Sequence, residues 1–269
     1  MASEKVGAVL VVGGGVAGIQ ASLDLADSGF KVYLIDQGAS IGGVMAQLDK
    51  TFPTNDCSMC ILSPKLVATG RHSNISLITN AEITGLNGKA GNLVKIRKRS
   101  RFINEEKCNG CGLCAQKCPI EAIDRFNEGL SGRSAIYVDY PQAVPLKFMI
   151  DREKCIGCST CQEICKAKAV QYDQKDTEAV LNVGSIILAP GFKHFNAKLK
   201  SEYGYGRFPN VVTSIEFERI LSASGPYGGL VLRSSDGEIP KRIAFIQCVG
   251  SRDFQLGNNY CSAACCMYG

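Results

Sequence analysis

Eight of the fourteen cysteines form one spacing that occurs twice in this chain. Each copy reads C-x2-C-x2-C-x3-C, and the eight residues are Cys108, Cys111, Cys114, Cys118, Cys155, Cys158, Cys161 and Cys165. Bacterial ferredoxins use this spacing for two 4Fe–4S clusters, and the fourth cysteine of each run ligates the cluster of the other run. We therefore predict crossed ligation: cluster one at Cys108, Cys111, Cys114 and Cys165, cluster two at Cys155, Cys158, Cys161 and Cys118.

The loops that would hold these cysteines contain small residues and one proline. Glycines within the runs let backbone N–H groups approach the sulfides of a cubane. Pro119 stops the first loop, and the ferredoxin pattern predicts a short helix that begins at residues 120–123. The second run has Lys166 at the position of the proline, which changes a turn residue and not a ligand.

A zinc ribbon and a disulfide framework are the alternatives to the iron–sulfur interpretation. Four zinc ligands would leave the repeated three-plus-one spacing unexplained. Disulfides are typical of secreted chains, whereas the polar start at residues 1–5 lacks the apolar region of a signal peptide. Fourteen cysteines in such a chain predict the reducing cytoplasm, where thiolates hold metal.

Composition limits the other function classes. A hydrophobic content of 45% over 269 residues is ordinary for a globular core. No apolar run approaches the roughly 18 residues of a membrane span, so we expect no transmembrane segment. The net charge of +5 allows an acidic partner but does not indicate nucleic acid. The two histidines have no candidate ligand or nucleophile beside them.

A second candidate site is the glycine-rich stretch Gly13, Gly14, Gly15, Val16, Ala17, Gly18, which matches G-x-G-x-x-G. An apolar strand at 6–12 precedes it, a helix pattern over 17–28 follows, and a strand at 31–35 leads to Asp36. This is the context in which the motif binds a dinucleotide, because the pyrophosphate then lies at the helix N-terminus.

Each part of that motif has its own expected task. Gly13 makes the tight turn, Gly15 admits the pyrophosphate, Gly18 lets helix and strand pack closely, and Asp36 accepts a hydrogen bond from the ribose. The motif alone does not separate FAD from NAD. Its place near the N-terminus, followed by Gly42 and Gly43, resembles two-dinucleotide-binding flavoproteins of the thioredoxin-reductase type and implies FAD.

Six cysteines remain outside the ferredoxin runs. Cys57 and Cys60 form a C-x2-C pair that fits a redox dithiol near flavin, half of a metal site completed elsewhere, or buried thiols. Spacing does not rank the first two. The others, spaced C-x12-C-x3-C-C, predict a third cluster whose ligands are Cys248, Cys261, Cys265 and Cys266.

Several further elements are predicted around these sites. Strands are expected at 93–102, 134–138, 179–183, within 184–191 and at 239–249, and a helix at 215–222. In the first strand, Val94 and Ile96 would face inward. Lys95, Arg97, Arg99 and Arg101 would form a solvated basic face.

The chain resembles the A subunit of heterodisulfide reductase and its relative, the A subunit of the quinone-interacting membrane-bound oxidoreductase. The resemblance is carried by the glycine motif, the T-N-D-C-S-M-C-I-L-S-P-K segment at 54–65, the double ferredoxin run, and the segments 247–253 and 260–267. It implies an FAD-bearing, multi-cluster protein that works with other subunits, and in some members flavin-based electron bifurcation. It also implies that the third cysteine set ligates a cluster.

The predicted fold is α/β, an incomplete thioredoxin-reductase-like Rossmann domain at 1–97 and 179–269 with a two-cluster ferredoxin domain inserted at 98–178. The chain stops at Gly269 directly after the last cysteines, so we expect a truncated or split form. The predicted function is electron transfer between flavin and clusters in a cytoplasmic oxidoreductase complex of anaerobic metabolism, with partners such as hydrogenase or ferredoxin. No catalytic acid, base or nucleophile is required. The alternatives are a non-catalytic ferredoxin-type relay and an NAD(P)H-dependent flavin and iron–sulfur enzyme.

Overall fold

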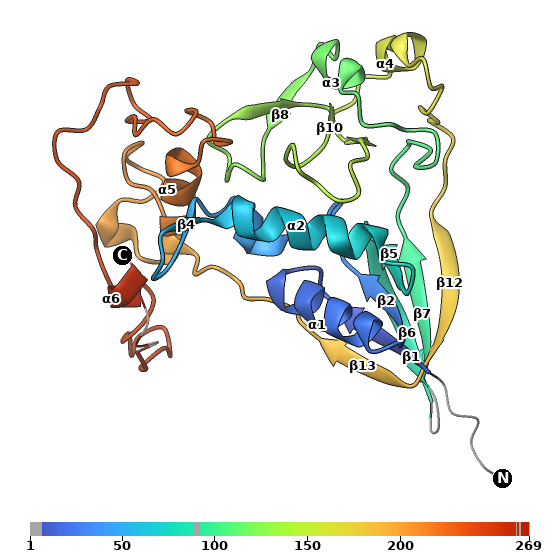
Figure 1. Cartoon of the computed structure of the whole chain (residues 1–269). Helices are drawn as coiled ribbons and strands as arrows, with labels where there is room; N and C mark the ends of the chain where they lie inside the picture. The colour runs from blue at the N-terminus through green and yellow to red at the C-terminus, as the bar shows by residue number, and fades with distance from the viewer. Residues whose placement is uncertain (1–6, 89–91, 262, 264, 269) are drawn as a thin grey trace.

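A four-stranded parallel sheet forms the centre of the molecule. The computed structural model describes residues 7–88, 92–261, 263 and 265–268 (Figure 1). The strand order is β13-β1-β2-β5, with bounds Ser185–Leu188, Ala8–Val12, Lys31–Ile35 and Ile75–Ile78. All three pairings are parallel. The predicted strands at 6–12, 31–35 and 184–191 are thus confirmed, and the last of them returns beside the first.

The two faces of this sheet are covered by different layers. Helices α1 (Val16–Asp27) and α2 (Ser58–Arg71) lie together on one face (Figure 1). Val11, Leu34 and Ile19 belong to the core on that side. The other face carries an antiparallel sheet of order β12-β7-β6, with bounds Thr177–Val183, Asn92–Lys98 and Ala81–Asn87. Successive residues of β1 point to opposite faces of the sheet. Strand β1 therefore contributes side chains to the apolar cores on both faces, as expected for a strand buried on two sides.

The ferredoxin-like segment enters and leaves through two paired strands. Strands β7 and β12 are antiparallel neighbours from Lys98 beside Thr177 to Asn92 beside Val183. Val94 and Ile96 are buried, as predicted. Between the two strands the chain forms α3 (Leu113–Gln116), β8 (Glu121–Ile123), β9 (Gly132–Ser134), β10 (Ile136–Tyr137), β11 (Met149–Ile150) and α4 (Thr160–Ile164). The segment has its own apolar core.

The region after the central sheet is mostly irregular. It contains the 3-10 turns η2 (Ala197–Leu199) and η3 (Ser201–Tyr203), and the helices α5 (Ser214–Leu221) and α6 (Cys265–Tyr268). Helix α5 confirms the prediction at 215–222 and begins with a capping box between Thr213 and Glu216. Among the described residues, no helix combines the length and apolar character that a bilayer span requires.

Two of the elements predicted after the glycine-rich motif are wrong. The predicted helix at 120–123 is absent, and Glu121–Ile123 form the strand β8 instead, because a turn around Asp124 returns the chain to β9 as its partner. Residues 239–249 form no strand in the described structure, where Ile239 and Phe245 are 72% and 61% exposed. An apolar run becomes a buried strand only beside a partner, and no described strand pairs with it.

Arg101 is also placed differently from the prediction. Instead of a solvated face it is 1% exposed, since β7 ends at Lys98 and the strand alternation stops there. Its guanidinium pairs with Glu105 at 2.5 Å and donates to the hydroxyl of Thr79 at 2.6 Å and to the carbonyl of Ala39. These contacts tie the start of the ferredoxin-like segment to the central fold.

Candidate cofactor sites

The glycine turn after β1 is closely packed at two positions. Gly13 has a φ of +106°, and a side chain there would overlap the carbonyl of Ala189 after β13. A side chain at Gly18 would overlap the carbonyl of Gly13. Both positions therefore require glycine, one for the turn and one for the approach of α1.

Gly15 differs from these two glycines because it faces open space. An added Cβ at this position meets no heavy atom within 4 Å. Gly15 is the N-cap of α1, no side chain caps the helix, and Val16 and Ala17 beside it are exposed. The unpaired N–H groups of a helix start favour an anion, so the space at Gly15 fits a pyrophosphate.

The predicted second glycine pair lies against this turn. The N–H of Gly42 donates to the carbonyl of Gly14 at 2.7 Å. A Cβ on Gly43 would come within 2.9 Å of the Cα of Gly15. Residues Gly43–Gln47 then form the 3-10 helix η1, which contacts α2. The later glycine pair thus lies directly against the turn of the sequence motif, and their joint role in binding FAD stays a prediction.

Asp36 stabilises the glycine turn through hydrogen bonds, a role that the sequence did not predict. Its Oδ2 accepts the N–H of Gly14 at 2.5 Å, and its Oδ1 accepts the N–H of Gly38 at 2.6 Å. Each carboxylate oxygen has a second lone pair, so a ribose hydroxyl could still donate to it. The ribose contact stays a prediction.

The predicted ligands of cluster two line one cavity in the ferredoxin-like segment. Its walls include Cys118 from the first run and Cys155, Cys158 and Cys161 from the second, together with apolar side chains and Tyr172. Burial raises the pKa of the Cys161 thiol, and the nearby Cys155, Cys158 and Cys118 thiols act in the same direction. Iron would bind the thiolate forms of these cysteines and would thereby offset the raised pKa. The four thiols fit the group.

The structure brings only some of the predicted ligands of cluster one into the apolar core of the ferredoxin-like segment. Burial raises the pKa of the Cys114 thiol to about 12, and the neighbouring Cys108, Cys161 and Cys111 thiols contribute in the same direction. Cys165 packs in the same apolar core as Cys108, Cys114 and Cys161, and its Sγ accepts the N–H of Ala169 at 3.3 Å. Helix α3, which carries Cys114, contacts α4, which carries Cys161, so the two predicted cluster sites are neighbours.

Tyr172 is a functional candidate that the sequence did not reveal. Its hydroxyl lies 3.0 Å from the Sγ of Cys161, within hydrogen-bond distance. A hydrogen bond to a ligand sulfur stabilises the more negative, reduced cluster. No motif marks this tyrosine, because the contact depends on the fold after the second run.

Removing that hydroxyl tests its effect on cluster two. In Tyr172→Phe we expect the reduction potential of one cluster to fall by about 40 mV, since a hydrogen bond of about 1 kcal/mol corresponds to that shift for one electron. The other cluster should keep its potential. Redox titration followed by EPR measures both, and equal shifts at both clusters would contradict a local hydrogen bond.

Three of the predicted ligands of the third cluster influence the fourth electrostatically. The Cys265 thiol raises the pKa of Cys266, burial adds to this, and the Cys248 and Cys261 thiols act in the same direction. The carbonyl of Cys248 accepts the N–H of Ser251 at 3.2 Å, so Cys248 precedes a turn and does not end a strand. Among the described residues, no three Cys, His, Asp or Glu side chains are close enough to hold a single metal ion. A cubane spreads its ligands over four irons and needs a wider set.

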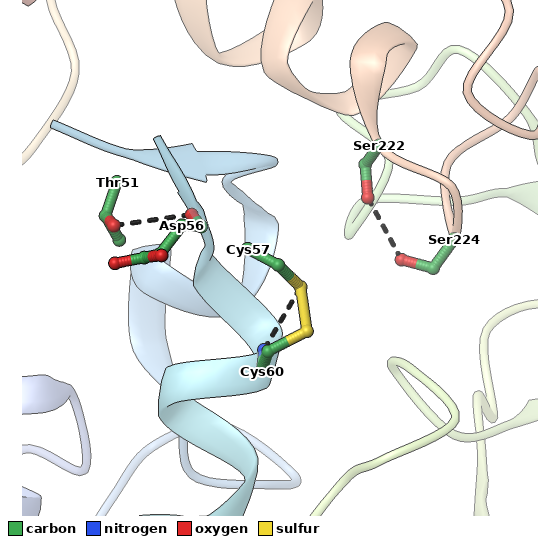
Figure 2. Close-up of a disulfide and its surroundings, with 6 residues drawn as sticks. All are labelled: Thr51, Asp56, Cys57, Cys60, Ser222 and Ser224. Atoms are coloured by element: carbon green, nitrogen blue, oxygen red, sulfur yellow. Dashed lines mark hydrogen bonds between the residues drawn. A yellow bond between two sulfur atoms is a disulfide. The ribbon is translucent and has the colours of Figure 1, made fainter. Parts of the chain in front are cut away.

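Cys57 and Cys60 form a disulfide at the start of α2 (Figure 2). The antiparallel strands β3 (Lys50–Thr51) and β4 (Asp56–Cys57) precede it. Cys57 is the N-cap of α2, and its Sγ accepts the N–H of Cys60 at 3.2 Å. Cys60 is exposed, so the interpretation as two buried thiols does not hold.

Family comparisons define the class of protein to which these sites belong. Residues 8–59 match the FAD dependent oxidoreductase family, and residues 101–124 and 146–167 each match a 4Fe-4S binding domain family. The fold is thus that of an FAD-dependent oxidoreductase, and both ferredoxin-type matches lie between β7 and β12.

Comparison with individual relatives is more specific than these family matches. The A subunit of the H(2):CoB-CoM heterodisulfide,ferredoxin reductase of Methanothermobacter marburgensis is 56% identical over 96% of this chain and 40% of that protein. One of the iron-sulfur A subunits of the CoB--CoM heterodisulfide reductase of Methanopyrus kandleri is 58% identical over the same shares. The resemblance to the A subunit of heterodisulfide reductase is confirmed, and the chain spans about 40% of the length of these relatives.

Similarity to solved structures is weak. The L-proline dehydrogenase of P. horikoshii is 26% identical and covers 35% of this chain and 20% of that protein, with a TM-score of 0.29. This value is too low to support an argument about function.

Proposed function

We propose that this chain carries electrons between FAD and 4Fe–4S clusters as part of a heterodisulfide-reductase-like oxidoreductase. The observation that carries the proposal is the cavity that unites Cys118 with Cys155, Cys158 and Cys161. The open space at Gly15, on the same chain, supports the flavin half of the proposal. The domain limits that we propose are 1–97, 98–178 and 179–269.

The contribution of the protein to such a function is to place and tune the redox groups. FAD and the clusters supply the electron chemistry, and the side chains hold them, exclude water and donate hydrogen bonds. The name of the Methanothermobacter marburgensis relative includes H(2) and ferredoxin. We propose other subunits of such a complex, and a hydrogenase or ferredoxin, as partners of this chain. Electron bifurcation and a cytoplasmic location are part of the same proposal.

Cofactor analysis tests the proposal directly. After anaerobic purification we expect about one FAD per chain, and about eight irons from two clusters or about twelve with the third. Flavin and iron are measured by extraction and by colorimetric analysis. Iron without flavin, even after incubation with FAD, would favour the ferredoxin-type relay instead.

The third cluster has its own test. Changing Cys265 and Cys266 together to Ser should remove about four irons, because two of the four proposed ligands are lost. The matched control changes Cys57 and Cys60 together to Ser and should keep all iron. A loss of about four irons only in the control would mean that the third set of ligands was chosen wrongly.

A further inference from the structure

The disulfide between Cys57 and Cys60 has no task in the proposed electron path. We propose that these two residues are a redox-active pair, which cycles between the disulfide and two thiols by exchange with a dithiol. This activity does not depend on the flavin or cluster sites. It adds a two-electron centre to the chain.

A structural role explains this disulfide poorly. It joins residues three apart, and the stabilisation from a cross-link grows with the length of the loop that it closes. The same two residues are already held together by the backbone. Cys57 pairs with Lys50 in the hairpin, the N–H of Ser58 donates to the carbonyl of Asp49 at 3.0 Å, and Cys60 lies in the first turn of α2.

These backbone contacts also make the pair reversible. The hairpin and the helix turn keep both sulfurs within reach of each other when the bond is broken, so neither state requires refolding. Pro64 lies inside α2 and has no N–H to donate to the carbonyl of Cys60, four residues earlier. The turn that carries the pair is therefore less tightly held by the rest of the helix.

The two sulfurs are not equivalent. Cys60 is exposed, whereas Cys57 is half-buried and its sulfur accepts the N–H of Cys60 at 3.2 Å. Cys57 also caps a helix of 14 residues that has no acidic residue in its first turn. The helix N-terminus and the N–H group both favour a thiolate on Cys57. Cys60 is thus the sulfur open to attack, and Cys57 is the better leaving group.

A second feature of the same turn points to a functional site. Ser58 lies between the two cysteines, is fully buried, and has a hydroxyl without a hydrogen-bond partner in the described residues. Buried hydroxyls are nearly always paired. The sulfur atoms themselves project to the side on which Ser222 and Ser224 lie (Figure 2).

The exchange balances without any other group. One thiolate of the dithiol attacks the Sγ of Cys60, the S–S bond breaks, and its electron pair leaves on the Sγ of Cys57. The second sulfur of the dithiol then attacks the sulfur already bound to Cys60, which releases the Cys60 thiolate. The dithiol becomes a cyclic disulfide, its two electrons reside on the two cysteines, and protons from water or from the dithiol complete the thiols.

The other cysteines give a reason to expect exchange. None of these twelve residues forms a disulfide, and as cluster ligands they would need conditions in which thiols persist. An exposed disulfide would meet the same reductants. A pair that is poised to open and close is compatible with those conditions, and a purely structural bond is not.

Peptide-level thiol trapping tests the redox cycle. The whole chain, purified anaerobically, is equilibrated with stepwise ratios of reduced and oxidised glutathione or dithiothreitol, and its thiols are blocked with N-ethylmaleimide. Trypsin cleavage after Lys50 and Lys65 releases residues 51–65, which contain only Cys57 and Cys60. We expect a reversible change from the doubly blocked peptide to the disulfide, with one midpoint from either direction. A pair that stays a disulfide in excess reduced dithiothreitol, or two thiols in excess oxidised glutathione, would overturn the proposal.

Two single variants test the assignment of the attacked sulfur. With oxidised glutathione, Cys57→Ser should accumulate a mixed disulfide on Cys60. Cys60→Ser should form one at Cys57 at least about tenfold more slowly, because limited access to the half-buried sulfur slows the reaction more than the favoured thiolate form speeds it. Equal or faster reaction of Cys60→Ser would overturn this assignment. Both variants should keep the iron of the unchanged protein, and iron loss in both would make the pair cluster ligands and refute the proposal. Failure of the flavin and cluster function would instead appear as missing cofactors in the unchanged chain.

Discussion

The Cys118→Ser variant is expected to lose the cluster of the second cysteine run and to keep the cluster of the first. Cys118 belongs to the first run by sequence, but it lines the cavity formed by Cys155, Cys158 and Cys161. Serine is a poor replacement for a thiolate ligand, so about four irons should be lost. In EPR spectra of the reduced protein, the spin–spin interaction between the two neighbouring clusters should disappear.

A reciprocal variant provides the control. Cys165→Ser removes the fourth cysteine of the second run and should damage the first cluster, since crossed ligation exchanges the fourth ligands. Adding Tyr172→Phe to each variant identifies the cluster that remains. Only cluster two has the hydrogen bond between Tyr172 and Cys161, so only its reduction potential should fall. An unaltered interacting spectrum in Cys118→Ser would contradict the crossed assignment.

The parts of the fold that were predictable have local signals. The strand, glycine turn and helix around Gly13 follow each other directly along the chain, and each has its own pattern of apolar residues. The return of the chain at β13 was predictable from its resemblance to a flavoprotein strand. The two ferredoxin-type runs were predictable from spacing, because cluster ligation imposes that spacing, and both runs fall in segments that match 4Fe-4S binding domain families.

The wrong predictions concern residues whose state depends on a distant partner. Residues 120–123 follow a proline in a way that suits a helix start, yet a strand beyond the next turn pairs with them. Residues 239–249 have the composition of a buried strand but no partner in the described structure. Arg101 fits a solvated strand face by alternation, but Glu105 and Thr79 offer it a buried ion pair and acceptor.

The same distinction applies to the candidate sites. Spacing identified the residues that could hold FAD and iron, but it did not identify the groups that support them. Asp36 braces the turn through Gly14, 22 residues away, and Tyr172 reaches Cys161 only after the chain has folded back. For Cys57 and Cys60 the spacing left several chemistries open. The structure adds the exposure and the helix cap that favour exchange.

The second large effect is expected at the glycine turn. Substitution of Gly15 should remove FAD with little loss of stability, whereas substitution of Gly18 should mainly reduce stability. In Gly15→Leu the side chain enters open space, so the free energy of unfolding should fall by no more than about 1 kcal/mol, the cost of a poor N-cap. That side chain would occupy the proposed pyrophosphate position, and we expect bound FAD to fall to background. Flavin per chain and a urea denaturation midpoint measure the two effects separately.

Gly18→Ala is the matched control for this loss. Its Cβ would overlap the carbonyl of Gly13, so the overpacking should cost about 1–3 kcal/mol of stability, and flavin should be lost only to the extent that the turn distorts. Gly15→Ala adds a single methyl group in the open space and should keep the stability of the unchanged chain while weakening FAD binding. If Gly15→Leu retained a full complement of flavin and an unchanged urea midpoint, the pyrophosphate could not lie at Gly15, and the FAD site would have to be placed elsewhere on the chain.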